Sequence, residues 1–226
     1  MDPTIFEPSI EDIIIRSRNT LLDILEDRGY DSTPYRNIAP DQVITLAGGT
    51  SRALDMMVKR KATTEPGAVV APCDRAFVCY FLQTQDRVKA RLGTFVRDIY
   101  EGDPETSPTK ADDVIVILNE PYLEAFDKAS LQMWQLQKAR MTFFHIKQVV
   151  VHLGRHRDVP PHRRLTPEEG KARMDRLHVT LKSQLPLIKH HDIQARLMGL
   201  VPGDIIEVLR PSATAGVAPV LRICAA

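Results

Sequence analysis

The segment richest in reactive side chains is VVVHLGRHRDVPPHRRLTPEE, residues 149–169, which holds three of the seven histidines and four arginines. Imidazole is a common zinc ligand, and the spacing of His152, His156 and His162 allows two rings to share one face of a helix. However, Gly154 and two prolines make a helix unfavourable here, and no cysteine lies nearby to complete a structural site. We therefore expect no metal site, although this is the candidate region for a metal-dependent hydrolase.

The four arginines of the same segment, Arg155, Arg157, Arg163 and Arg164, could instead meet phosphate groups. No aromatic residues alternate with them, so the segment lacks the stacking surfaces typical of proteins that bind single-stranded nucleic acid. An acidic protein partner explains the cluster at least as well as DNA does. We therefore favour a protein-facing surface.

Catalytic motifs are missing from the chain. It has no GxSxG, no P-loop and no GxGxxG, and the carboxylates around VIVIL (residues 114–118) lack the charged pair that a metal-dependent nuclease would need. Cys73 and Cys79 flank an apolar run and are most simply core residues. We therefore expect no catalytic residues, no cofactor and no small-molecule substrate.

Charge is distributed unevenly along the 226 residues. Residues 1–144 hold 17 Lys and Arg against 22 Asp and Glu, whereas residues 145–226 hold 13 against 7 and include all seven histidines. This asymmetry predicts two domains with a boundary at 144/145. No run is long and apolar enough to span a bilayer, and the acidic start does not resemble a signal peptide, so we expect no membrane association.

Hydrophobic periodicity and chain-breaking residues predict the elements that position these side chains. A helix should begin after the N-cap Ser9 and end at Gly29, and a second should begin at Pro167 after the N-cap Thr166. The other expected helices are 51–62, 86–101, one with Pro121 near its first position, and 192–200; the expected strands or β-rich stretches are 42–46, 75–82, 114–118, 143–153, 203–211 and 218–224. This order predicts an α/β N-terminal domain and a small α+β C-terminal domain with a mixed sheet and short helices.

The second half resembles a known family. HRDVPPHRRLTPEE, residues 156–169, is similar to the H-x-x-V-P-x-H-x-x-L-T-x-E-E signature of the fifth-largest subunit of eukaryotic nuclear RNA polymerases and of its archaeal counterpart. QLPLI, DIQARLMGL and RPSATAG (residues 210–216) follow in the family's order. The first half resembles the eukaryotic jaw domain less closely, through LEDRGY, FVCYF and VIVIL in sequence.

The resemblance implies a non-catalytic subunit of a multisubunit DNA-directed RNA polymerase. Residues 1–144 would be a jaw domain near downstream DNA, and residues 145–226 an assembly domain that docks on the largest subunit and meets other subunits. The partner-interface residues that it implies are His156, Val159, Pro160, His162, Arg196, Arg210, Pro211, Ser212, Thr214, Gly216 and Arg222.

The jaw resemblance places Pro121 near DNA, and we expect Lys128 to help in this contact. The acidic balance of this half predicts only weak contact through the assembled complex. The alternative function is a free-standing nucleic-acid-binding transcription regulator that reuses the fold. Departures such as Ile193 and Ala213 indicate a divergent member, for which we expect a large DNA virus as the source and a distant protist as the alternative. A cellular protein would be nuclear, and a viral one would lie in the virion or the infected cell.

Overall fold

A four-stranded mixed sheet organises the N-terminal part of the computed structural model, which describes residues 8–49, 52–62, 69–82, 88–101 and 107–226. Its strands lie in chain order, with β1 antiparallel to β2 and the other neighbours parallel. All six residues of β3 are buried, as expected for a central strand built from β-branched side chains. The strands are β1 (Met56–Lys59), β2 (Arg75–Phe81), β3 (Asp113–Leu118) and β4 (Arg140–His145).

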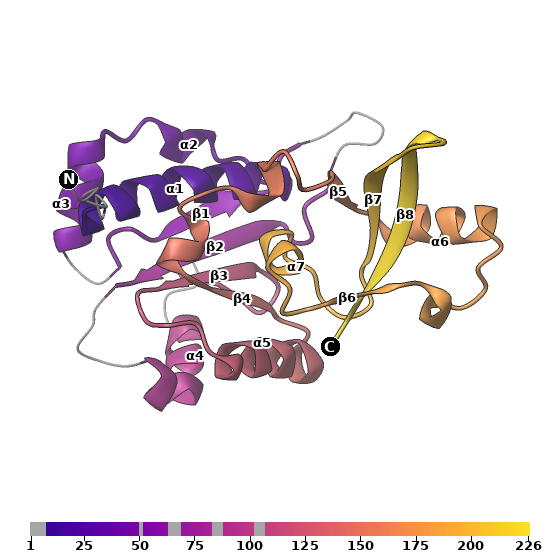
Figure 1. The fold of residues 1–226 in the computed structure, drawn as a ribbon. Helices are drawn as coiled ribbons and strands as arrows, with labels where there is room; N and C mark the ends of the chain where they lie inside the picture. The colour runs from indigo at the N-terminus through magenta and orange to yellow at the C-terminus, as the bar shows by residue number, and fades with distance from the viewer. Residues whose placement is uncertain (1–7, 50–51, 63–68, 83–87, 102–106) are drawn as a thin grey trace, which may run out of the picture.

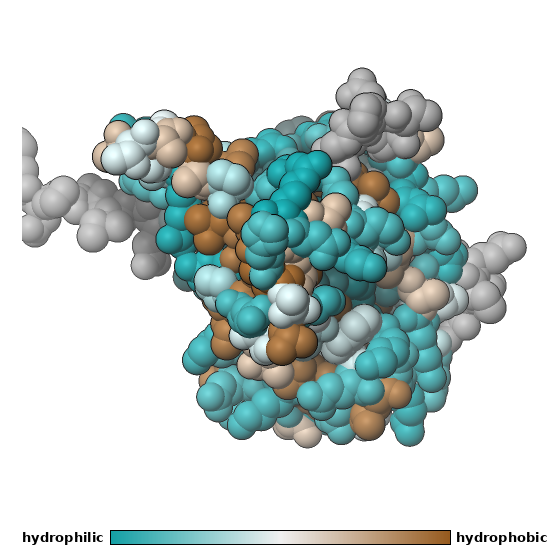
Figure 2. Space-filling view, turned by 90° about the vertical axis from the view of Figure 1, so that its right-hand side faces the viewer, coloured by the Kyte–Doolittle hydropathy of each residue, from teal (hydrophilic) through white to brown (hydrophobic). Residues whose placement is uncertain are grey.

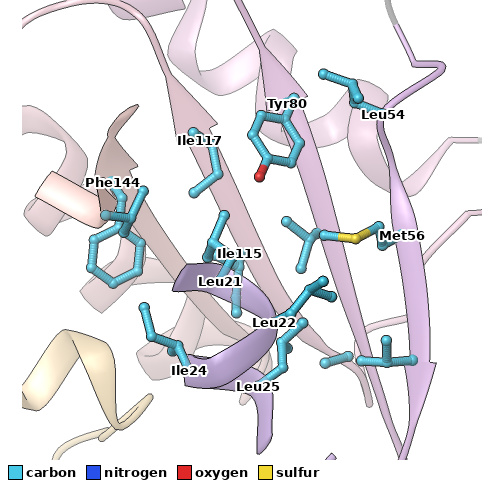
Figure 3. Close-up of a cluster of buried hydrophobic side chains, with 14 of the residues drawn as sticks. Leu21, Leu22, Ile24, Leu25, Leu54, Met56, Tyr80, Ile115, Ile117 and Phe144 are labelled. Atoms are coloured by element: carbon cyan, nitrogen blue, oxygen red, sulfur yellow. The ribbon is translucent and has the colours of Figure 1, made fainter. Parts of the chain in front are cut away.

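Helices cover both faces of this sheet (Figure 1). On one face, α1 (Ile10–Asp27) packs its leucines and isoleucines against β-strand side chains such as Ile115, Tyr80 and Phe144 (Figure 3). On the other face, α4 (Leu92–Tyr100) and α5 (Glu124–Gln137) cover a second apolar cluster. The sheet with helices on both faces confirms the predicted α/β class. The shorter elements here are α2 (Thr33–Arg36), α3 (Pro40–Gly48) and the 3-10 helix η1 (Val88–Arg91).

The ends of α1 follow the local signals in the sequence. The Ser9 hydroxyl accepts a hydrogen bond from the Asp12 backbone N–H at 3.1 Å, which caps the first turn. After the helix, Gly29 has φ +94°, and a Cβ there would lie 2.8 Å from backbone atoms of Val69 and Ala71. Only glycine combines this conformation with this close approach, so both predicted limits of the helix are confirmed.

A second four-stranded sheet organises the C-terminal part, in the order β5-β7-β8-β6. β6 runs parallel to β8 and the other pairs are antiparallel, so the predicted mixed sheet and α+β class are confirmed. Its strands are β5 (His162–Arg164), β6 (Leu187–Lys189), β7 (Ile205–Ser212) and β8 (Gly216–Ala225). Its helices are α6 (Pro167–Arg176) and α7 (Ile193–Leu197), with 3-10 helices η2 (Ile146–Val149), η3 (Leu153–Arg155) and η4 (Lys182–Gln184). No helix in the described part of the chain is long and apolar enough to cross a membrane.

Two N-terminal predictions were wrong. Residues 42–46, expected to form a strand, lie within α3, which begins with Pro40 at its first turn followed by Asp41. Residues 56–59, expected within a helix, form β1, because pairing with β2 overrides the helical pattern of this stretch. The start of that expected helix, residue 51, lies outside the described residues, as do the first two residues of the helix expected at 86–101.

The transition between the two parts also differs from expectation. Residues 143–145 end β4, and the chain then turns into η2 instead of continuing as a strand. Ile146 and Val149, which fall after the predicted boundary at 144/145, are buried in the N-terminal core. Because β4 is a parallel strand of the first sheet, its continuation packs beside α1.

Candidate functional site

A buried arginine joins the two parts of the chain. The Arg28 guanidinium donates from Nη1 to Asp113 Oδ2 at 2.8 Å, from Nε to the Leu197 carbonyl at 2.8 Å and from Nη2 to the Arg196 carbonyl at 2.6 Å. The two carbonyls end α7, where helix carbonyls have no partner within the helix. Arg28 therefore satisfies α7 of the C-terminal part and a carboxylate of β3 together. No local sequence signal marks Arg28 or Asp113 as partners.

Arg196 is a predicted interface residue that lies inside the chain. Its residue surface is 7% exposed, and its guanidinium stacks over the Tyr122 ring with 4.1 Å to the centroid. Its Nη1 donates to the Phe143 carbonyl at 3.1 Å and lies 3.3 Å from the Gln148 side-chain oxygen. The expectation that Arg196 faces a partner is thus corrected, because α7 folds its side chain against the N-terminal part.

The basic segment meets acidic side chains of its own chain. Arg155 pairs with Asp27 at 2.7 Å and with Asp23 at 3.2 Å, both on α1. His152 Nε2 also lies 3.0 Å from Asp27. Burial raises the pKa of the Asp27 carboxyl, but His152 and Arg155 outweigh it and leave the pKa below its ordinary value. Positive charge that we expected to face an acidic protein partner is therefore paired with carboxylates of the same chain.

The three histidines of this segment have separate partners. The His156 ring accepts from the Asp158 N–H at 3.2 Å, and His162 Nδ1 lies 2.6 Å from the Pro160 carbonyl oxygen. Burial lowers the pKa of His162 below its ordinary value. The Pro160 carbonyl raises this pKa, but its effect is smaller than that of burial. Among the residues that the structure describes, no group of three or more His, Cys, Asp or Glu could hold a metal ion.

The start of the family signature, residues 156–160, forms a compact turn. The Val159 N–H donates to the His156 carbonyl at 2.9 Å, and Val159 and Pro160 are half-buried. His156 itself is exposed and His162 is half-buried at the start of β5. This turn therefore leaves His156 accessible while Val159 and Pro160 support it.

Most of the other predicted interface residues gather at the turn of the β7–β8 hairpin, at its upper end in Figure 1. Arg210, Pro211, Thr214 and Gly216 are exposed and Ser212 is half-buried, with Gly216 at φ +68° in the turn. Arg222 lies further along β8 and donates to the Leu187 carbonyl at 3.0 Å. Two apolar side chains not singled out by the sequence, Leu209 (39%) and Val217 (59%), are also exposed on this hairpin. The structure thus brings five of the predicted residues together.

Exposed leucines form a feature that the sequence analysis missed. Leu177, Leu181 and Leu187 are 57%, 61% and 58% exposed and lie at the end of α6, before η4 and in β6. Figure 2 shows the end of the molecule formed by these elements, with hydrophobic residues among hydrophilic ones. A helix end and a short strand carry no pattern that would reveal such exposure.

The two residues predicted to lie near DNA are on the surface of the N-terminal part. Pro121, expected near the first position of a helix, is exposed in the loop that precedes α5 and lies three residues before the first residue of that helix. Lys128 is exposed on α5 and pairs with Glu124 at 3.5 Å. The carboxylate of Glu124 therefore competes with phosphate for this lysine.

Comparisons with known proteins identify relatives of this chain. Residues 151–224 match the family model "RNA polymerase Rpb5, C-terminal domain". The subunit rpabc1 of DNA-directed RNA polymerases I, II and III from Dictyostelium discoideum is 27% identical over 217 residues, which cover 95% of this chain and 100% of that protein. The corresponding subunit from Caenorhabditis briggsae is 26% identical over 205 residues, covering 89% and 90%.

An archaeal relative is more similar over a shorter length. The DNA-directed RNA polymerase subunit Rpo5 of Pyrococcus abyssi is 46% identical over 66 residues, which are 29% of this chain and 79% of that protein. The identity to this relative, the share of it that is covered and the match to the family model all indicate the same family. The chain therefore belongs to the Rpb5 family of DNA-directed RNA polymerase subunits.

Proposed function

We propose that this chain is a non-catalytic, structural subunit of a multisubunit DNA-directed RNA polymerase, and that its C-terminal part docks on the largest subunit. The part of this proposal that concerns a polymerase rests on the names of the relatives, which are DNA-directed RNA polymerase subunits. The observation that carries the docking proposal is the exposed β7–β8 hairpin, where Arg210 and neighbouring motif residues lie beside the exposed Leu209 and Val217.

The hairpin combines the features of a protein-binding surface. Arginines contribute strongly to binding free energy at many interfaces, and here Arg210 is exposed on one face of the hairpin while Leu209 and Val217 are exposed on the other. The hairpin also extends beyond its neighbouring strands: β5 pairs with residues 206–208 of β7, and β6 pairs with residues 223–225 of β8. In the described part of the chain, no third strand pairs with residues 210–212 or 216–222. Their backbone edges are thus available to a partner.

The motif residues close to the hairpin extend this surface. His156 is exposed, and Pro160 supports the turn that leads into β5, which pairs with β7. Since the Leu209 N–H donates to the Pro161 carbonyl at 3.0 Å, the turn and the hairpin are physically connected. We therefore assign His156, the supporting Val159 and Pro160, His162 and the hairpin residues to one docking surface, with Arg222 at its border.

For the N-terminal part we propose a jaw role, with weak contact to downstream DNA near Pro121 and Lys128 in the assembled enzyme. The excess of acidic residues in this half and the Glu124–Lys128 pair both oppose strong phosphate binding. We also propose that nucleotide addition takes place on other subunits, since no motif for that chemistry occurs in the sequence.

The docking proposal is tested by measuring binding of the full-length chain to the purified largest subunit of its own polymerase. Arg210→Ala and Val217→Asp should each weaken binding by about tenfold or more, because each removes a central contact. Arg176→Ala, at an exposed arginine of α6, is the matched control and should bind like the unmodified chain. Absence of binding, or equal affinity for all variants, contradicts the proposal.

A further inference from the structure

The β7–β8 hairpin extends as a two-stranded ribbon beyond the strands that flank it. β5 pairs with β7 as far as Val208, and β6 pairs with β8 only from Ile223 onward. The pairing of β7 with β8 continues in regular register to Ser212 and Gly216, next to the turn at the upper end of the hairpin in Figure 1. The ribbon therefore has two faces and two edges that a partner can approach.

One face of the ribbon is apolar. Side chains alternate between the two faces of a strand, and residues paired across two strands share a face. On this side, Ile205 and Leu221 are buried in a cluster with Met174 of α6. Nearer the turn, the same side continues as two exposed pairs, which we call the apolar face: Leu209 with Pro219, and Pro211 with Val217.

The opposite face of the ribbon is basic. Arg210 and Arg222 lie there, because their positions alternate with the apolar ones along β7 and β8. His162 joins them through its pairing with Val208. Burial has the largest effect on the pKa of His162 and lowers it, and the charges of Arg222 and Arg210 lower it further. We call these three residues the basic face.

Positive charge exceeds negative charge on the basic face. In the described part of the chain, neither Arg210 nor Arg222 forms an ion pair with a carboxylate. One carboxylate, Asp192, acts on the histidine of this face. Asp158, in the turn before β5, is matched by Arg157 at 3.4 Å. The basic face therefore complements acidic side chains of a partner.

The β7 edge of the ribbon has no free backbone donor. The Leu209 N–H donates to the Pro161 carbonyl at 3.0 Å, so the backbone groups of Leu209 point away from β8. Those of Pro211, two residues further, point the same way, but proline has no N–H. This edge therefore offers carbonyl groups alone.

The β8 edge is closed in the same manner. The Ile223 N–H donates to the Pro186 carbonyl at 2.9 Å, so alternate residues back to Val217 point their backbone groups outward. The Val217 N–H is used by the Ala215 carbonyl at 2.8 Å, and Pro219 has no N–H. Because a paired strand needs donors as well as acceptors, both edges of the ribbon oppose the addition of a strand.

We propose that the ribbon inserts into a cleft of the largest subunit, with an apolar wall against the apolar face and a wall carrying Asp or Glu against the basic face. This inference rests on the proposed docking function and adds the shape and chemistry of the partner surface. A flat surface would contact one face, and an added strand would need the missing donors. A cleft uses both faces.

Binding of the full-length chain to the purified largest subunit measures the contribution of each face. Val217→Ser and Arg210→Glu should each weaken binding by about tenfold or more, and the double variant by about the product of the two effects, because the faces meet separate walls. High salt should reduce the effect of Arg210→Glu and not that of Val217→Ser. Leu181→Ser and Arg176→Glu, at exposed positions elsewhere, are the matched controls and should bind like the unmodified chain.

Pro219→Val tests the edges. Valine keeps an apolar side chain on the apolar face and restores an outward N–H on β8. We expect its affinity to stay within about twofold of that of the unmodified chain, since the cleft does not use this edge. Tighter binding would indicate that a strand is added to β8 and would overturn the proposal.

Hydroxyl-radical footprinting of the complex gives a measurement without variants. Val217 and Val220 lie on opposite faces of β8, and both should lose reactivity on binding. Protection of one face alone, or weaker binding of variants on one face alone, would overturn the cleft and leave docking intact. Absence of any binding would contradict the docking proposal itself, so the two failures are distinguishable.

Discussion

Arg28 and Asp113, 85 positions apart in the sequence, form an ion pair at 2.8 Å with side chains that are 1% and 0% exposed. Tyr30 donates its hydroxyl to the same Asp113 oxygen at 3.3 Å. Because Arg28 also donates to the last carbonyls of α7, this pair lies at the contact between the two parts of the chain.

Removing either partner of this pair should be costly, because it leaves an unpaired charge in the interior. Arg28→Met should lower the free energy of unfolding by about 3–5 kcal/mol, measured by urea titration. The matched control is Arg97→Met, whose ion pair with Glu101 is exposed and should contribute less than about 1 kcal/mol. Equal effects of the two changes would contradict the account of a buried junction.

Asp55 should make stability depend on pH. Burial raises the pKa of its carboxyl to about 6, more than the hydrogen bond from the Tyr80 N–H and the charge of Arg52 lower it. The folded state therefore binds more protons than the unfolded state between roughly pH 4 and pH 6, so ionisation of Asp55 lowers stability as the pH rises through this window.

Asp55→Asn tests this dependence. In the unmodified chain the Tyr80 N–H donates to Asp55 at 3.1 Å, and the side-chain oxygen of asparagine can still accept this hydrogen bond. We expect the variant to exceed the unmodified chain in stability by about 1–2 kcal/mol at pH 7.5, with a smaller difference at pH 4. Urea titrations at both values measure it. A difference that grows as the pH falls would show that the sign is wrong.

Arg196 should contribute to stability and not to docking. Lysine cannot reproduce the stacking on Tyr122 together with the bond to the Phe143 carbonyl, so Arg196→Lys should cost about 1–2 kcal/mol. Its affinity for the largest subunit, measured well below the melting temperature, should be unchanged. Arg210→Lys, at an exposed arginine, should change stability by less than about 0.5 kcal/mol. Weaker docking of a fully folded Arg196→Lys would restore the interface role.

The capping box of α6 gives a local prediction. The Thr166 hydroxyl accepts from the Glu169 N–H at 3.2 Å, and Glu169 accepts from the Thr166 N–H at 3.1 Å. Thr166→Ala should therefore cost about 1 kcal/mol and speed amide hydrogen exchange in α6 more than in α1. Uniform acceleration in both helices, or none, would contradict a local capping role.

The sequence correctly predicted the elements whose ends are determined by residues close to them in the chain. Ser9, Gly29 and Thr166 are caps with a direct steric or hydrogen-bonding cause, and VIVIL needs burial on both faces. In contrast, β1 forms because β2 lies beside it, and short-range periodicity contains no information about that neighbour.

The same distinction applies to the candidate site. The exposed hairpin residues follow from two strands and a turn, which the sequence predicts. Arg196 was misplaced because arginine is seldom buried, and its burial depends on how α7 meets the first sheet. The pairing of Arg28 with Asp113 likewise depends on tertiary contacts that no spacing in the chain reveals.

The central claim is membership of an assembled polymerase, and affinity purification of the tagged full-length chain from its native source, followed by mass spectrometry, tests it most directly. We predict recovery of two very large polymerase subunits in amounts equal to the chain, and their sequences would also distinguish a viral source from a cellular one. Recovery of the chain alone, or with unrelated proteins, would contradict the claim and favour a free-standing nucleic-acid-binding regulator.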